Sequence, residues 1–174
     1  MPSGRWSDRQ AEYAMYFFYC VFIAVSWQIG GLRSSLFLIL LGYWYNNNRG
    51  SDANAFVRNL INAMGFTCFG TGALEIALRR RLNYLPALGE ELITRSLVKW
   101  VIIVAAVVFS TVQTQDMPDQ EGDAQRGRKS LPLQVGDLPA RWITTIMMVY
   151  FGAFFALYTG GGEPWDMLLA RCWP

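Results

Sequence analysis

Three aspartates stand close together in a polar stretch that separates two apolar segments. Asp116, Asp119 and Asp123 are spaced three and then four residues apart within Gln113–Arg141. This spacing places all three on one face if the segment is helical. Hard cations such as Mg²⁺ take oxygen ligands and usually bind through one or two carboxylates plus substrate phosphates. The three aspartates are therefore candidate metal ligands and candidate catalytic residues.

A basic group follows the aspartates directly. Arg126, Arg128 and Lys129 would suit the cationic clamp that a metal-bound diphosphate needs on its remaining oxygens. Two other interpretations of the stretch stay open. Charged residues also gather in any water-exposed loop between membrane helices, where opposite charges merely neutralise one another. A calcium loop is the weaker alternative, because the alternating ligand pattern of an EF-hand is absent.

The composition indicates what must position these residues. Of the 174 residues, 53% are hydrophobic and 15% are aromatic, which is typical of a membrane protein rather than a soluble domain of this size. The net charge of only +2 argues against a nucleic-acid partner. The chain contains no histidine, which excludes histidine-based nucleophilic catalysis and histidine-ligated zinc. Three scattered cysteines without a CxxC pair predict no disulfide framework, and we expect Cys20 and Cys68 to be packed thiols.

We predict an all-α, multi-pass bundle of transmembrane helices that forms a single domain over residues 1–174, an integral membrane protein in an endomembrane. Several segments approach the roughly 20 apolar residues that a bilayer requires. The five expected spans are Ala11–Ile29, Leu32–Tyr45, Phe56–Leu78, Ser96–Val112 and Trp142–Thr159. The residues between the second and third spans, Asn46–Asn54, predict a loop because they consist of turn-forming and polar types. Five spans would put the N-terminal segment and the aspartate-containing loop on one face of the membrane.

The third expected span is unusually polar at its start. Arg58, Asn59 and Asn62 fall in its first two turns, and polar side chains in a membrane helix generally face the bundle interior or a wet cavity. Asn59 and Asn62 are candidates for contact with a substrate diphosphate. The alternative is that they form hydrogen bonds between helices.

The polar stretch resembles a known family motif. Gln115-Asp116-Met117-Pro118-Asp119-Gln120-Glu121-Gly122-Asp123, then Gly127-Arg128-Lys129-Ser130, then Gly136-Asp137 and Ala140-Arg141, are similar to the second aspartate-rich motif of the UbiA-type intramembrane prenyltransferases. Pro2-Ser3-Gly4-Arg5 resembles the stretch that follows the first such motif. Val57-Arg58-Asn59-Leu60-Ile61-Asn62-Ala63 is similar to a fungal natural-product branch of the superfamily.

The resemblance implies a partial UbiA-like fold and Mg²⁺-dependent transfer of an isoprenyl group from a prenyl diphosphate to an unidentified acceptor. Asp119 and Asp123 would be metal ligands, Asp116 a further ligand or a neighbouring acid, and the three basic residues would contact the diphosphate. The family's first aspartate-rich motif would lie before Pro2. Asn46-Asn47-Asn48 with Asp52 is no substitute, because it supplies only one carboxylate. We therefore expect this chain alone to be inactive or nearly so.

Three other functions stay open on the sequence. A membrane terpene cyclase of the same superfamily would use the same site and close the isoprenyl chain on itself. A catalytically inactive membrane protein would keep the helices without a competent site. A transporter is a weaker possibility, suggested by intramembrane residues such as Arg58 and Glu75.

Overall fold

The computed structural model describes residues 7–79, 82 and 91–159, and every regular element within them is helical. The all-α prediction is therefore confirmed. The elements are α1 (Asp8–Ile29), α2 (Leu32–Asn46), α3 (Gly50–Ala53), α4 (Ala55–Leu78), α5 (Glu91–Thr111), η1 (Val112–Gln115), α6 (Gln120–Gln125), α7 (Leu131–Val135) and α8 (Asp137–Thr159). The motif at residues 2–5 and most of the polar connection after Arg79 lie outside the described residues.

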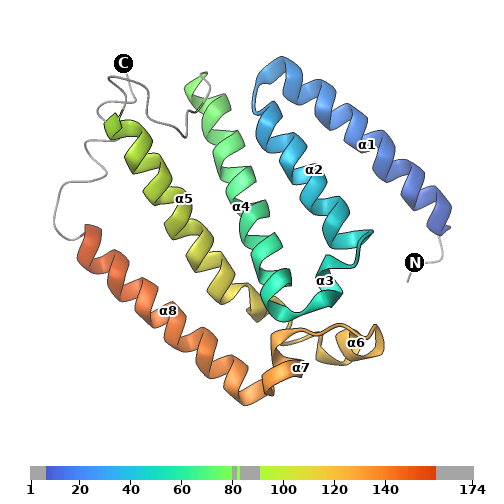
Figure 1. The fold of residues 1–174 in the computed structure, drawn as a ribbon, viewed down its shortest axis with the longest axis vertical. Coiled ribbons are helices and arrows are strands. Elements are labelled where there is room, and N and C mark those ends of the chain that lie inside the picture. Colours follow the sequence, from blue (N-terminus) through green and yellow to red (C-terminus); the bar gives the residue numbers. More distant parts are fainter. Residues whose placement is uncertain (1–6, 80–81, 83–90, 160–174) are drawn as a thin grey trace.

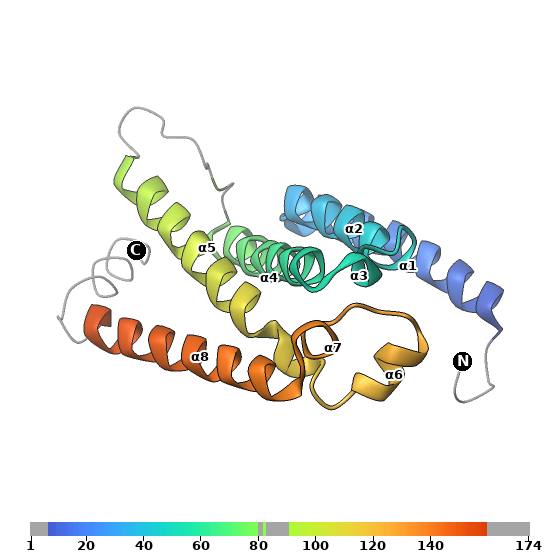
Figure 2. The same cartoon turned by 60° about the horizontal axis from the view of Figure 1, so that its bottom comes forward.

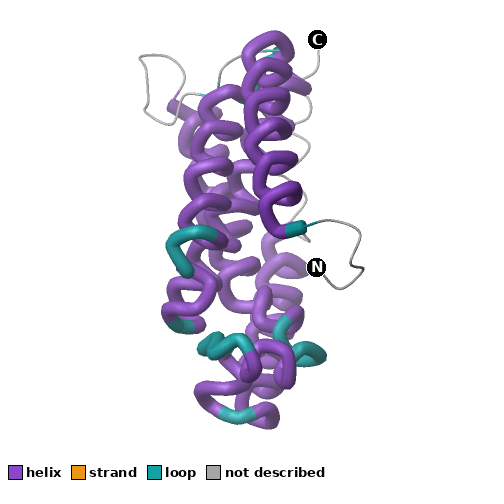
Figure 3. Tube along the Cα trace, turned by 90° about the vertical axis from the view of Figure 1, so that its right-hand side faces the viewer, coloured by secondary structure: helices purple, strands orange, loops and turns teal. Residues whose placement is uncertain are grey.

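The five long helices form a row in which each packs on the next. α1 contacts α2, α2 contacts α4, α4 contacts α5 and α5 contacts α8. Figure 1 shows the helices of this row side by side, with their axes diverging toward one side, and Figure 3 shows that the row is narrow when viewed from its edge. The start of α1, the connection from α2 to α4, and the segment from η1 to α7 all lie toward the same end. That the N-terminal segment and the aspartate-containing loop share one face of the membrane stays a prediction.

All five predicted spans coincide with long helices, but three of them have the length and composition of a membrane span. These are Ala55–Leu78, Leu97–Gln115 and Asp137–Leu157. α2 has 15 residues, fewer than the roughly 20 that a bilayer requires. That α1 and α2 also cross the membrane stays a prediction.

The connection between α2 and α4 differs from the predicted loop. Within Asn46–Asn54 the chain forms the short helix α3, so the prediction of an irregular loop throughout is wrong. α3 begins after Arg49, whose φ of 53° lies in the left-handed region. Asn54 then caps α4, because its Oδ1 accepts a hydrogen bond from the backbone N–H of Val57 at 2.8 Å. This cap fixes the first turn of α4, which contains Arg58 and Asn59.

Small and hydroxylic residues hold α2 against its neighbours. Ser26 of α1 and Ser35 of α2 share a hydrogen bond of 2.7 Å, and Ser34 and Thr71 share one of 3.1 Å between α2 and α4. A Cβ atom at Gly31 would lie 3.4 Å from the carbonyl oxygen of Gly72. Close approach at small residues and hydrogen bonds between helices are the usual means by which membrane helices associate.

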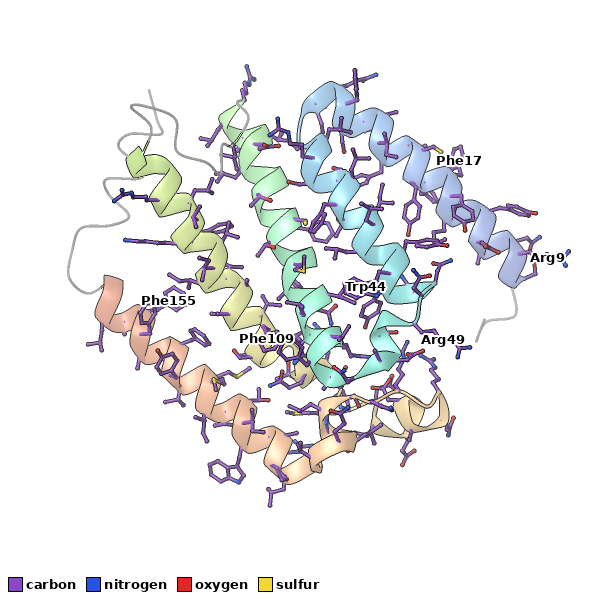
Figure 4. The ribbon with its side chains drawn as sticks, in the orientation of Figure 1. Arg9, Phe17, Trp44, Arg49, Phe109 and Phe155 are labelled. Carbon is purple, nitrogen blue, oxygen red and sulfur yellow. The ribbon has the colours of Figure 1, made fainter. Side chains whose placement is uncertain are left out.

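The outer faces of the row are apolar. Phe17 of α1 is 63% exposed and Leu157 of α8 is 83% exposed. Figure 4 shows Phe17 pointing away from the row, as a lipid-facing side chain would. Cys68 is buried as predicted, but Cys20 is exposed on the outer face of α1, so its assignment as a packed thiol is wrong.

Replacement of Gly50 by alanine should destabilise the connection that holds α3. A Cβ atom at Gly50 would lie 2.7 Å from Ile61 Cδ1 and 3.0 Å from the carbonyl oxygen of Trp44. Overpacking of this kind costs about 1–3 kcal/mol. We expect a lower thermal unfolding midpoint in detergent micelles for Gly50→Ala. Gly152→Ala is the matched control, because a Cβ there meets nothing within 4 Å; an equal loss in both variants would contradict this packing argument.

Candidate functional site

The predicted site loop crosses one end of the helix row. η1 contacts α4, α5 and α8, and α7 packs on α8. Figure 2 shows α6 and α7 projecting from this end beside α3. Arg49, labelled in Figure 4, lies at the corner where α3 faces the loop. Charged residues of the loop therefore meet residues of α3 and α4 that are distant in sequence.

The three aspartates do not occupy one face of a single helix. Asp116 follows η1, Asp119 is the N-cap residue of α6, and Asp123 lies within α6. Asp116 and Asp123 are 3% and 1% exposed, whereas Asp119 is exposed. Among the described residues no three carboxylate or cysteine groups come together as a metal cluster. A proline at position 118 and the turn around it lie between Asp116 and Asp119, and Asp123 follows Asp119 by one helical turn of α6.

Asp116 forms a buried ion pair with Arg58 of α4. Arg58 Nη2 donates a hydrogen bond to Asp116 Oδ1, and the two side chains are 10% and 4% exposed. The ring of Tyr45, at the end of α2, lies 6.0 Å from the Arg58 guanidinium. Burial raises the pKa of the Asp116 carboxyl above its ordinary value; Arg58 opposes this shift and the nearby Asp123 charge adds to it. Arg58 thus anchors the start of the site loop to α4.

Arg128 joins two further carboxylates. Its Nη1 donates to Asp123 Oδ1 at 3.1 Å, and its Nε donates to Asp52 Oδ1 of α3 at 3.3 Å. Burial lowers the pKa of Arg128, but the hydrogen bond and charge of Asp123 outweigh that effect and raise it overall. We call the five residues Asp52, Arg58, Asp116, Asp123 and Arg128 the ionic cluster.

A neutral hydrogen-bond chain lies beside the ionic cluster and joins three helices. Asn59 Nδ2 donates to Gln113 Oε1 and to the carbonyl oxygen of Phe109, each at 3.0 Å. Gln113 Nε2 in turn donates to Thr144 Oγ1 of α8 at 3.1 Å. The Nδ2 group of Asn59 is therefore committed to acceptors within the protein, as the hypothesis of hydrogen bonds between helices requires. A contact from Asn59 or from the half-buried Asn62 to a diphosphate stays a prediction.

The other predicted diphosphate contacts lie at the surface. Arg126 and Lys129 are exposed, and Arg128 alone of the three forms ion pairs in the described part of the chain. Long exposed basic side chains can reach a ligand bound over the loop, but their role stays a prediction.

The donor set of the cluster fits a hard cation that shares its ligands with a substrate. Asp123 Oδ2 is buried and has no hydrogen-bond partner, and Arg58 Nη1 and Ser130 Oγ are in the same condition. Buried polar atoms of this kind normally have partners, so these three are free to receive a ligand or water. Asp123 and the nearby Asp116 would supply the one or two carboxylates that Mg²⁺ uses beside phosphate oxygens.

A comparison with known proteins gives the family of the chain. The sequence profile of the UbiA prenyltransferase family matches residues 1–172. The chain belongs to the UbiA prenyltransferase family. Family membership and the three candidate spans agree in placing the chain in a membrane environment.

A curated relative adds a second comparison. The chain is 30% identical over 162 residues to a fumagillin beta-trans-bergamotene synthase of Aspergillus fumigatus, and the match covers 91% of this chain and 51% of that protein. The chain thus spans about half the length of the curated relative. No solved structure matches this chain significantly.

Two site residues escape the sequence prediction. Asp52 follows a turn-forming tract and is dismissed there as a lone carboxylate, yet it pairs with Arg128 across 76 residues of sequence. Gln113 opens the predicted loop and is 1% exposed. Its position immediately after a long apolar run is a possible signal, since a polar residue there must find partners inside the bundle.

Replacement of Arg58 by methionine should destabilise this protein in a pH-dependent way. The variant leaves the buried Asp116 carboxylate without its cation, and breaking such a pair typically costs about 3–5 kcal/mol. The pKa of the Asp116 carboxyl is raised in the folded protein. This shift stabilises the folded state at pH values below 3.8, the ordinary pKa of an aspartate, and the stabilisation is lost as the pH rises through the raised pKa. Without Arg58 the pKa rises further. The stability difference from wild type should therefore be large at neutral pH and shrink as the pH falls.

This prediction is checked by denaturant unfolding of both proteins across the acidic range. Arg141→Met is the matched control, because the Arg141–Asp137 pair is 55% and 45% exposed and surface pairs contribute little. A loss in Arg58→Met that does not vary with pH would assign the effect to lost packing against Tyr45.

Replacement of Gln113 by leucine should loosen α8 from α4. The variant removes one of the two acceptors of the Asn59 Nδ2 group and the amide that donates to the Thr144 hydroxyl, while the bonds to the Phe109 and Ala140 carbonyls remain. Each lost hydrogen bond costs about 0.5–1.5 kcal/mol. Unfolding free energies of Gln113→Leu, Thr144→Val and the double variant would measure the coupling. Strict additivity would contradict a connected chain. Gln125→Leu, at an exposed position of α6, is the control.

Proposed function

We propose that this chain contributes the diphosphate-binding end of a UbiA-type enzyme that breaks the bond between an isoprenyl carbon and a diphosphate oxygen. The observation that best supports this function is the ionic cluster, which gathers two arginines and three aspartates at one end of three candidate membrane spans. A prenyl diphosphate has the same polarity, with a charged head and an apolar tail. Its head would bind at the cluster while its tail enters the apolar region between helices.

Each residue of the cluster has a role in this proposal. Asp123 and Asp116 would hold Mg²⁺, and the exposed Asp119 would contribute only if the loop rearranged around the bound ion. Bound Mg²⁺ supplies charge stabilisation to the departing diphosphate. Arg128 would donate to a diphosphate oxygen through the edge of its guanidinium, while Asp123 keeps the guanidinium in position. Arg126 and Lys129 would approach the same head group from the surface.

The helices would protect the reacting carbon. Departure of the diphosphate leaves an allylic cation that water would quench, so the apolar segments must exclude water from it. Phe56, two residues before Arg58 in α4, and Phe109, near the end of α5, pack edge to face with ring centroids 5.1 Å apart. Aromatic faces at such a position can stabilise a cation electrostatically.

Two fates of the cation are compatible with this site. The family description favours attack by an acceptor, which gives prenyl transfer. The similarity to a bergamotene synthase favours closure of the isoprenyl chain on itself to give a terpene. Both fates release inorganic diphosphate, and they differ in whether an acceptor is required.

The proposed site is tested in the longest available form of the protein, by diphosphate release from a series of prenyl diphosphates of increasing length in the presence of Mg²⁺. Asp123→Asn removes a buried charge with little change of shape and should lower release by roughly 10²–10³-fold, the scale of losing one preorganised electrostatic group. Asp137→Asn is the control, since Asp137 pairs with Arg141 outside the cluster. Full activity in Asp123→Asn would overturn the site assignment. Hydrocarbon product without acceptor would identify a cyclase, and release only with acceptor would identify a transferase.

A further inference from the structure

Asp52 is a charged residue of the ionic cluster to which the proposed reaction assigns no role. It lies in α3, where the hydroxyl of Ser51 donates to its Oδ1 at 3.0 Å. The same oxygen accepts from Arg128 Nε at 3.3 Å. Asp52 therefore occupies one of the donor positions of the arginine that would bind diphosphate.

The two carboxylates on Arg128 are not equivalent. The side chain of Asp123 is 1% exposed and that of Asp52 is 31% exposed. A buried carboxylate that leaves its cation meets a large desolvation cost, whereas an exposed one is solvated by water. A ligand oxygen that approaches Arg128 would thus displace Asp52 and leave Asp123 in place.

The charge of the cluster also depends on Asp52. Three carboxylates and two guanidinium groups give a net charge of −1. The exposed charges of the loop, Arg126, Lys129 and Arg141 against Asp119, Glu121 and Asp137, balance in number, and Arg49, the exposed N-cap residue of α3, adds one positive charge outside the cluster. A free diphosphate, itself strongly anionic, meets a cluster of like sign. One divalent cation changes the cluster's net charge to +1, and diphosphate then meets a cluster of opposite sign.

We propose that Asp52 makes diphosphate binding at Arg128 conditional on Mg²⁺, by competing for the arginine and by adding the charge that gives the cluster its negative sign. This inference rests on the proposed function. It goes further in assigning a role to Asp52, which holds no metal itself. The consequence is that the site discriminates against free anions and accepts the diphosphate only together with its metal.

The test is the affinity of this chain, in detergent micelles, for inorganic pyrophosphate, measured by calorimetry with excess Mg²⁺ and with a chelator. Wild type should bind pyrophosphate with Mg²⁺ and bind it far more weakly without. Asp52→Asn keeps an acceptor oxygen for Arg128 but removes the charge. We take the ratio of the dissociation constant measured with the chelator to the one measured with Mg²⁺. This ratio should be smaller by about tenfold or more in Asp52→Asn than in wild type, the scale of one charge at a partly exposed site. Asp137→Asn, which removes a charge from another carboxylate–arginine pair, should leave the ratio unchanged.

Asp52→Ala separates charge from orientation. The proposal expects it to bind pyrophosphate without Mg²⁺ at least as well as Asp52→Asn, since it lacks both the charge and the competing acceptor. Weaker binding than wild type would mean that Asp52 orients Arg128, and would overturn the proposal. An unchanged ratio in Asp52→Asn overturns it as well, while wild-type binding with Mg²⁺ leaves the proposed function standing. Absence of wild-type binding even with Mg²⁺ overturns the proposed diphosphate site and this inference together.

Discussion

The buried pair between Arg58 and Asp116 is the constraint on which the arrangement of the site depends. A charged group near the start of a membrane helix has to be paired or solvated, and Arg58 is 8% exposed. It reaches Asp116, at the point where the chain leaves η1, and so ties the site loop to α4. The cost of burying both charges is offset only while the two remain together.

The rest of the ionic cluster is built outward from that pair. Asp123 lies close enough to Asp116 to raise its pKa, and Arg128 neutralises Asp123 and extends to Asp52 on α3. The side chains of Arg58, Asp116 and Asp123 are at most 10% exposed, whereas those of Arg128 and Asp52 are 22% and 31% exposed. The deepest contacts hold the loop, and the outermost contact is the one that a ligand can exchange. A binding site needs both kinds of contact, because a rigid frame orients the ligand while an exchangeable group admits it.

Beside the cluster, the row of helices is held largely by polar and small residues. Asn59, Gln113 and Thr144 connect α4, α5 and α8, and Ser34 with Thr71 connects α2 to α4. Burial of apolar surface contributes little to the association of helices that are already surrounded by lipid tails. Hydrogen bonds between helices and close approach of their backbones at small residues stabilise the association instead. The aromatic and aliphatic side chains are instead exposed along the outer faces of the row. This distribution is the reverse of a soluble core, and it suits an enzyme whose substrate has an apolar tail.

Much of this protein is determined by the sequence itself. Long apolar runs interrupted by glycine and asparagine fixed five of its helices, because backbone groups in a membrane must satisfy one another within each helix. The aspartate-rich stretch identified the family and two buried carboxylates of the site.

The sequence could not determine which groups neutralise those carboxylates. Arg58 and Asp52 lie 58 and 76 residues from their partners, and only the packing of α3 and α4 against the loop brings them into contact. Regular spacing likewise suggested one helical face for Asp116, Asp119 and Asp123. A turn at Pro118 interrupts that face, and the ion pairs of Asp116 with Arg58 and of Asp123 with Arg128 hold these two carboxylates in the interior while Asp119 lies at the surface. Pairing of charges that are distant in sequence is a property of the tertiary structure, because a charged side chain can be buried only where the folded chain supplies a partner of opposite charge.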